Sequence, residues 1–427
     1  MRTFTYYCGL FVGLIMLLGL WPADSLGAQT QIRSDTLFRV FQRDTASEED
    51  ASVLPTYEYL QIDTGELEDY GLSFHIYGWG RSDLADSEYY EDQSTGELLY
   101  GYLEYRRPGN QYGLRLGRQH VFEGVANETV DGVRLSGNLG NYFELSVYGG
   151  QPVGLASVQG RDGDSIYGGR LSHHKGSNYE IGISYKASEN DDETGEEMMG
   201  VDLEVFLSEG FSLFGYSSYN QETDGWAEQS WELRVPVGRL TLKPYYRHFS
   251  YEDYFSTGAN AVNPFLVLAQ STEELTAYGV DGLWQYNANW TFGGKVKQND
   301  YDQVDSDQAY SILVDWRGGE NTQCGAEIGR TAAENTAGND YTLVRLYGFS
   351  EAMAGRLGVD FVSADVLAAY YDEEIYGKDS SLFVSFGGGR RFMGDALAVK
   401  LSGDYSKDPY FDEDLRAVVT VTYIYAK

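Results

Sequence analysis

The side chains with the greatest capacity for chemistry are five histidines, at His75, His120, His173, His174 and His248. They are scattered along the chain without the spacing of a metal site. The sequence also lacks a Cys-x-x-Cys-His haem attachment motif, a Gly-x-Ser-x-Gly motif and a phosphate-binding loop. We therefore predict a protein that is not an enzyme and carries no catalytic residue, metal or cofactor of its own. A hydrolase that pairs a carboxylate with a histidine is a minor alternative.

Carboxylates are the other abundant reactive groups, and they occur in runs such as Glu48–Asp50, Asp191–Glu193, Asp372–Glu374 and Asp412–Asp414. Runs of like charge are usually solvated surface rather than acid–base pairs. These runs lie in the long connections between the regularly patterned segments, and those connections together account for the net charge of −34. One face of the molecule is therefore expected to be strongly anionic.

The N-terminus indicates export from the cytoplasm. Arg2 precedes an apolar run, Leu10–Leu20, and small residues follow at Ser25–Ala28. This is the arrangement of a cleaved leader, so residues 1–28 are predicted to be a signal peptide. Its removal would leave Cys324 as the only cysteine, which excludes an intrachain disulfide. The mean hydropathy of −0.39 argues against a membrane protein built from helices.

The elements that would position any functional side chain are extended segments with strict alternation. Leu415–Tyr425 is the clearest, with Leu415, Val419, Val421 and Tyr423 on one face. About ten alternating residues are enough for a tilted strand to cross a bilayer. We count about 22 such segments from Leu37–Arg43 onward, with little helical signal between them. The alternative, an acidic secreted β-protein, would show the same alternation.

The connections between these segments alternate in length. Short turns such as Pro236–Arg239 contain glycine or asparagine, and they are separated by longer connections such as Arg81–Glu97, Gln151–Asp164 and Leu367–Ser380. Outer-membrane barrels have this rhythm, with short periplasmic turns and longer extracellular loops. Residues 29–427 are therefore predicted to form a single all-β domain. It would be a large transmembrane antiparallel β-barrel of about 22 strands (20–24), with both termini periplasmic.

Alternation also predicts which side chains face the lumen. A Lys or Arg side chain on the lipid face near the membrane midplane costs roughly 2–4 kcal/mol, so the charged face of each strand should be wet. The predicted pore-lining residues are Arg115, Glu180, Lys186, Glu232, Arg234, Lys243, Arg247, Lys295, Lys297, Asp315 and Arg317. Both signs are interspersed, so no charge ladder for ion selectivity is visible. The simpler alternative is that they are solvated or cross-strand-paired wall residues without a binding role.

A barrel of about 22 strands is too wide for side chains to fill. Two segments could fold inward. One is the longest loop, Ser250–Glu274, with its apolar run Ala261–Ala269, which could equally pack over the barrel mouth. The other is Gln119–Thr129, which carries Phe122 and Val125.

Leader, strands, turn rhythm and closing strand together resemble Gram-negative outer-membrane porin-like barrels, although Tyr425 is followed by Ala426 and Lys427, where such barrels usually end on an aromatic residue. The resemblance implies an outer-membrane location, lipid as a partner and no nucleic acid. It implies one of three functions. The first is a channel for small solutes or ions. The second is a sheath around multihaem c-type cytochromes for extracellular electron transfer, and the third is a structural or adhesive barrel.

Overall fold

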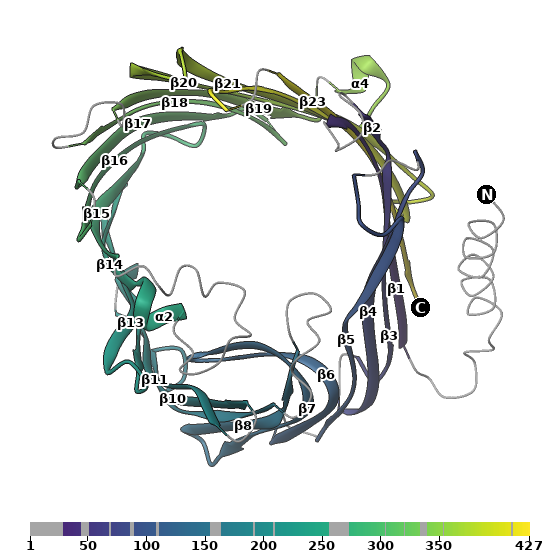
Figure 1. Ribbon diagram of the computed structural model, residues 1–427, viewed down its shortest axis with the longest axis vertical. Coiled ribbons are helices and arrows are strands. Elements are labelled where there is room, and N and C mark those ends of the chain that lie inside the picture. The colour runs from purple at the N-terminus through teal and green to yellow at the C-terminus, as the bar shows by residue number, and fades with distance from the viewer. Residues whose placement is uncertain are drawn as a thin grey trace.

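The computed structural model describes residues 29–43, 51–67, 70–85, 89–107, 111–153, 164–190, 193–207, 210–255, 273–303, 305–319, 321–333, 340–352, 354–410 and 413–427. In this part of the chain, 23 strands form one antiparallel sheet that closes on itself (Figure 1). Strand β1 (Gln29–Arg43) joins the two ends, because it pairs with β3 (Pro55–Gly65) on one side and β23 (Asp414–Ala426) on the other. Two backbone bonds between Thr30 and Lys427, at 2.9 and 3.0 Å, continue this closure.

The remaining strands follow one another around the ring, each paired with its neighbours in sequence. They are β4 (Gly71–Asp83), β5 (Ser94–Arg106), β6 (Tyr112–Glu123), β7 (Ala126–Leu139), β8 (Phe143–Pro152), β9 (Ser165–His174), β10 (Tyr179–Asn190), β11 (Glu193–Phe206), β12 (Ser212–Asn220), β13 (Gly225–Val237), β14 (Leu240–Ser250), β15 (Glu274–Gln285), β16 (Trp290–Tyr301), β17 (Asp307–Arg317), β18 (Thr322–Ala333), β19 (Tyr341–Ser350), β20 (Phe361–Ile375), β21 (Lys378–Phe392) and β22 (Leu397–Lys407). Two short helices are described, α2 (Tyr251–Phe255) and α4 (Ala354–Leu357).

The barrel wall has 22 strands, because β2 (Ala51–Val53) is too short to count as a separate crossing. It pairs with the end of β1 and continues the line of β3 beyond an interruption at Leu54. The predicted all-β barrel of about 22 strands is therefore confirmed. Both described chain ends lie at the same end of the barrel, as an even number of antiparallel strands requires. That this end is periplasmic stays a prediction.

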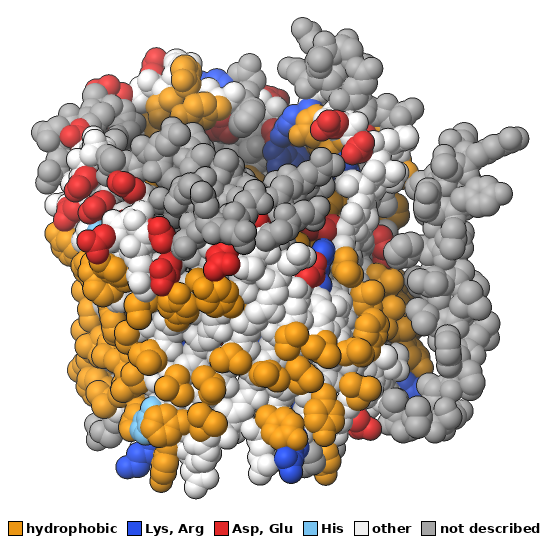
Figure 2. Space-filling view, turned by 60° about the horizontal axis from the view of Figure 1, so that its bottom comes forward, with side chains coloured by type: hydrophobic (Ala, Val, Ile, Leu, Met, Phe, Trp, Pro, Cys, Tyr) orange, Lys and Arg blue, Asp and Glu red, His pale blue; other side chains and the backbone are white. Residues whose placement is uncertain are grey.

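The apolar face of the strands points outward. Ile312, Val296 and Ile183 expose 65%, 63% and 56% of their surface, which is unusual for aliphatic side chains in water. Figure 2 shows such side chains in a broad band around the visible wall, with most of the visible Asp and Glu above the band and Lys and Arg both above it and at its lower edge. This distribution matches a bilayer-facing belt between two aqueous ends. No helix in the described ranges is long and apolar enough to cross a membrane.

One predicted long connection is wrong. Leu367–Ser380 belongs mostly to β20 and β21, which meet in a tight turn at Tyr376 and Gly377. Both residues have positive φ, 50° and 75°, as a two-residue turn that matches the twist of a hairpin requires. The strand ends within Leu367–Ser380 were missed because strands that extend past the membrane no longer need an apolar lipid face. Gln119–Thr129, the candidate for folding inward, also consists of two strand ends around a two-residue turn.

Two other predictions concern segments that lie wholly or partly outside the described residues, the signal peptide and the longest loop. The predicted signal peptide, residues 1–28, lies outside the described residues, and β1 begins at Gln29. In the predicted loop Ser250–Glu274 the described part includes α2, whereas 256–272, with the apolar run, lie outside the described residues. The segment Leu357–Val366 was predicted to be a strand. Helix α4 and the turn after it occupy its first residues, so β20 begins only at Phe361.

Candidate functional site: the lumen wall and its inward-folded hairpin

The inner face of the barrel can be followed from strand to strand by register, because directly paired residues share a face. Arg115 pairs with Arg134, Arg134 with Tyr148, and the same face continues through Lys186 on β10. All eleven predicted pore-lining residues fall on this face, opposite the outer apolar band. That they line a conducting pore stays a proposal.

Several of these residues are paired with neighbours in the wall. Arg115 Nε lies 2.8 Å from Glu104, and Lys295 Nζ lies 3.4 Å from Glu327. Glu180 accepts a 2.7 Å bond from Arg170. The prediction did not include the partner Arg170, because its strand has little of the regular alternation seen in the others.

Other predicted residues meet one another or aromatic rings. Glu232 lies 3.7 Å from Lys243, and Arg317 lies 3.4 Å from Asp315. The Asp315 carboxylate also accepts bonds from Gln323 and Tyr347, at 2.6 and 2.9 Å. Four residues remain. Arg247 lies 5.2 Å from the ring centre of Tyr245, Lys186 contacts the inward-folded hairpin, and the other two are Arg234 and Lys297. The eleven are thus spread around the wall, not gathered into one cluster.

Beyond Arg118 of β6 and before Val130 of β7 the hairpin is no longer paired with β5 and β8, and this end of it folds inward across β8 to β11 (Figure 1). At its tip, the Val125 backbone N–H donates a 3.1 Å hydrogen bond to Ser184 Oγ on β10. The tip approaches so closely that a Cβ on Gly124 would lie 2.1 Å from that oxygen. Gly124 also has a positive φ of 60°, so glycine is required here for two reasons. Of the two segments named as candidates for folding inward, Gln119–Thr129 is therefore one that does so.

A small apolar core seals the hairpin against the wall. Val121, Ala126 and Val130 from the hairpin pack with Tyr148 of β8 and Ile166 of β9. None of the five is more than 5% exposed, which makes this the one buried hydrophobic cluster among the described residues. Burial of this kind stabilises by roughly 25 cal/mol per Å² of apolar surface, so the cluster holds the hairpin against the wall.

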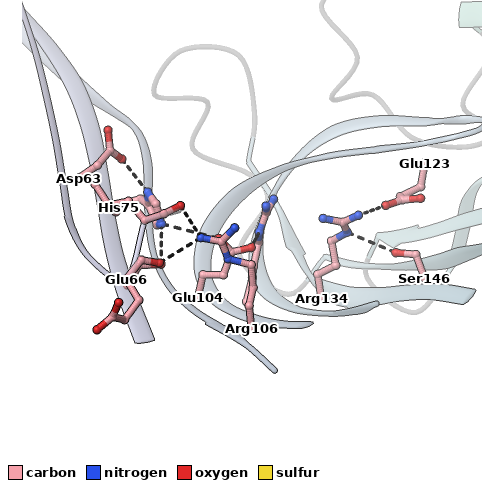
Figure 3. Close-up of polar contacts among 11 residues, drawn as sticks. Asp63, Glu66, His75, Glu104, Arg106, Glu123, Arg134 and Ser146 are labelled. Carbon is pink, nitrogen blue, oxygen red and sulfur yellow. Dashed lines mark hydrogen bonds and ion pairs between the residues drawn. The ribbon is translucent and has the colours of Figure 1, made fainter. Parts of the chain in front are cut away.

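Ion pairs reinforce the same contact. The buried Lys186 ammonium lies 3.2 Å from Glu128 on the hairpin and 2.6 Å from Glu196 on β11. Beside the turn at the hairpin tip, Glu123 forms an ion pair with Arg134, whose Nε also donates a 3.2 Å bond to Ser146 (Figure 3). The sequence analysis predicted Lys186 but missed both of its glutamates.

A second cluster of polar side chains lies on β3, β4 and β5, on the other side of β6. His75 Nδ1 lies 2.6 Å from Asp63, and its Nε2 lies 3.7 Å from Glu104, which also faces Arg106 at 3.7 Å (Figure 3). Arg106 is held in turn by the Leu67 carbonyl oxygen at 2.7 Å. In the described part of the chain no three His, Cys, Asp or Glu side chains are placed to hold a metal ion.

Two tyrosines outside the membrane-spanning strands have perturbed acidity. Burial and a hydrogen bond to Tyr57 raise the pKa of Tyr90, in the connection between β4 and β5. Burial likewise raises the pKa of Tyr254 in α2. Both hydroxyls are therefore neutral at physiological pH and act as hydrogen-bonding groups.

No family model and no curated protein matches the sequence. Among solved structures, the chain is similar to a BenF-like porin from Pseudomonas fluorescens Pf-5, at 10% identity and a TM-score of 0.48, covering 94% of this chain and 99% of that one. Acinetobacter baumannii OccAB4 follows, at 8% identity and a TM-score of 0.47, covering 95% and 100%. The P pilus usher (PapC) translocation pore shows 10% identity and a TM-score of 0.47, covering 92% and 99%.

The closed sheet and its apolar outer surface fit a protein that crosses a membrane. A closed antiparallel sheet has no unpaired edge and is one of only two structures whose backbone can cross a bilayer. The apolar outer belt and polar inner face of this barrel fit such a crossing. The described part of the chain therefore has the architecture of a membrane-spanning β-barrel.

Proposed function

We propose that this chain is an outer-membrane channel that lets small hydrophilic solutes or ions diffuse through a lumen narrowed on one side by the β6–β7 hairpin. By strand number and spacing, a barrel of 22 strands is on the order of 40 Å across between opposite backbones. Its inner face is charged in both signs, which favours a water-filled interior over a packed one. The eleven residues predicted to line the pore lie on that face.

The observation that carries the proposal is that charges on the inner wall are paired within the wall. Arg170 meets Asp202 at 2.5 Å, Arg345 meets Asp365 at 2.5 Å, and Lys186 meets Glu196 at 2.6 Å. A wall whose charges satisfy one another is stable next to water and needs no protein partner to neutralise it.

The two alternatives are less well supported. A sheath around multihaem c-type cytochromes would have to accommodate a folded protein beside an anchored hairpin that already occupies one side of the lumen. A structural or adhesive barrel would use the anionic connections and would have no need of a polar interior. The channel is also proposed to be exported by a cleaved leader, residues 1–28, and to have its termini in the periplasm.

Solute flux combined with visible absorption separates these functions. Purified barrel in liposomes should release a small trapped solute and retain a folded protein, and the preparation should show no haem absorption. If the liposomes retain both the small solute and the folded protein, and the preparation shows a Soret band at fixed stoichiometry, the sheath would be supported. Release of neither without haem would support the structural barrel.

A further inference from the structure

Six aromatic side chains share the inner face of three adjacent strands, β3, β4 and β5. Register places them there, since each pairs directly with another residue of the same face and their neighbours along the strands alternate to the outer face. They are Tyr57, Tyr59, Tyr77, Trp79, Tyr100 and Tyr102. We call this set the aromatic track. All six are half-buried, so part of each ring remains open to the lumen.

The rings of the track form an unbroken series of contacts. Tyr57 lies 6.2 Å from Trp79, Trp79 lies 6.5 Å from Tyr59, and Tyr59 lies 6.4 Å from Tyr77 between ring centres. The series continues from Tyr77 to Tyr100 at 5.4 Å. These separations are typical of interacting aromatic pairs, so the rings hold one another in position.

The track runs along the barrel axis. Tyr57 is near the end of β3 that meets the acidic connections, and Asp63 is six positions nearer the chain termini, which at about 3.3 Å per residue is about 20 Å. At the end nearer the acidic connections, the Tyr57 hydroxyl lies 3.2 Å from the Tyr90 hydroxyl. The Arg81 guanidinium lies 3.6 Å from the centre of the Tyr90 ring.

At the end nearer the chain termini, the track reaches polar side chains. The rings of Tyr100 and Tyr102 are 5.7 Å apart, and Tyr102 stacks on His75 at 4.8 Å. His75 is bonded to Asp63, and Arg115 lies 5.2 Å from the ring centre of Tyr102. A solute that follows the rings therefore meets charged side chains of both signs, which can donate and accept hydrogen bonds.

Membrane anchoring does not explain these rings. Interfacial girdles lie on the lipid face at two levels, whereas the track lies on the inner face and extends along the axis. Core packing does not explain them either, since the buried hydrophobic cluster of the described residues lies beneath the β6–β7 hairpin and includes none of the six. Partly exposed rings in rows, with few polar groups at fixed places, are characteristic of ligand sites.

We propose that the aromatic track binds a linear, neutral oligosaccharide as it passes through the channel. A pyranose ring has flat C–H faces that stack on aromatic rings, and its hydroxyl edge suits Tyr hydroxyls and mixed carboxylate and guanidinium groups. The polar groups at the track ends carry both signs, Arg81 and Arg115 against Asp63 and Glu104, which favours a neutral ligand over an anion or a cation. This inference rests on the proposed channel function, because it names the solute class.

The test uses single-channel currents of the full mature barrel in lipid bilayers, with linear glucose oligomers of increasing length added to one side. The inference predicts transient blocks whose duration rises with the number of sugar units. Trp79→Ala should weaken binding about three- to tenfold, the value of one ring contact, and Trp79→Phe should stay within about twofold. Tyr105→Ala removes a ring from the outer face of β5 and should leave the blocks unchanged.

The outcomes separate the two proposals. Ion conduction without blocks by any oligomer would overturn the carbohydrate track and leave the channel standing. Blocks by 4-hydroxybenzoate or tetraethylammonium, but not by sugars, would replace the ligand class. If no current flows, the channel proposal fails, and calorimetric titration of the detergent-solubilised barrel with glucose heptamer then decides whether the track binds sugar.

Discussion

Replacing Lys186 by methionine should release the β6–β7 hairpin from the wall. The Lys186 side chain is 6% exposed and is the only cation within 4 Å of Glu128 among the described ion pairs. Lys186→Met keeps the length of the side chain but leaves two glutamates without their cation. Removing one partner of a buried pair costs about 3–5 kcal/mol. Because Glu128 is 30% exposed, water screens part of this loss, and we expect about 2–3 kcal/mol.

At about 1.4 kcal/mol per factor of ten, this loss raises the detached fraction of the hairpin roughly 30- to 150-fold. Hydrogen exchange in nanodiscs should show faster exchange of the amides of residues 119–130, while β14 to β22 stay protected. Adding Glu128→Gln should restore part of the protection, because the uncompensated charge is removed.

The matched control is Lys295→Met, which removes a 47%-exposed ammonium that pairs with Glu327 elsewhere on the inner wall. Exposed pairs contribute about 0–1 kcal/mol, so the hairpin should be unaffected. Equal exchange of residues 119–130 in the two variants would refute the reasoning that Lys186 anchors the hairpin.

Three further predictions follow from the same structure. Gly124→Ala should displace the hairpin tip from Ser184 and shorten channel openings. The control is Gly140→Ala, which also has a positive φ but whose added Cβ would have no atom within 4 Å, so it should cost only the backbone strain of about 1–2 kcal/mol. Ile312→Arg should lower the folding free energy in lipid by roughly 2–4 kcal/mol, and Ser311→Arg, which faces the lumen beside Glu327, should be tolerated; equal losses would contradict the face assignment. The net charge of −34 should make the channel cation-selective at 0.1 M KCl, with reversal potentials near zero at 1 M salt, and anion selectivity would refute this.

The fold was predictable because period-2 alternation is imposed by the bilayer. Leu415–Tyr425, predicted from its pattern alone, is β23 with one residue added at each end. Strand ends outside the membrane carry no such constraint, which is why β20 was predicted to end before its last nine residues, Leu367–Ile375.

The site was less predictable because it depends on register between distant segments. The sequence identified Gln119–Thr129 as a candidate for folding inward but gave no sign that Val121 and Val130 would pack on Tyr148 and Ile166. The aromatic track was invisible for the same reason. Each of its tyrosines is one of 36, and only pairing of three strands brings six rings together.

The most direct test of the account compares single-channel conductance of the intact barrel with that of a variant whose hairpin is shortened. Gln119 and Val130 are paired across β6 and β7, so residues 120–129 can be replaced by an Asn-Gly turn. We expect discrete ion-conducting steps from the intact barrel and larger steps from the shortened variant. Equal step sizes would contradict a lumen narrowed by this hairpin, and no steps from either protein would contradict the channel itself.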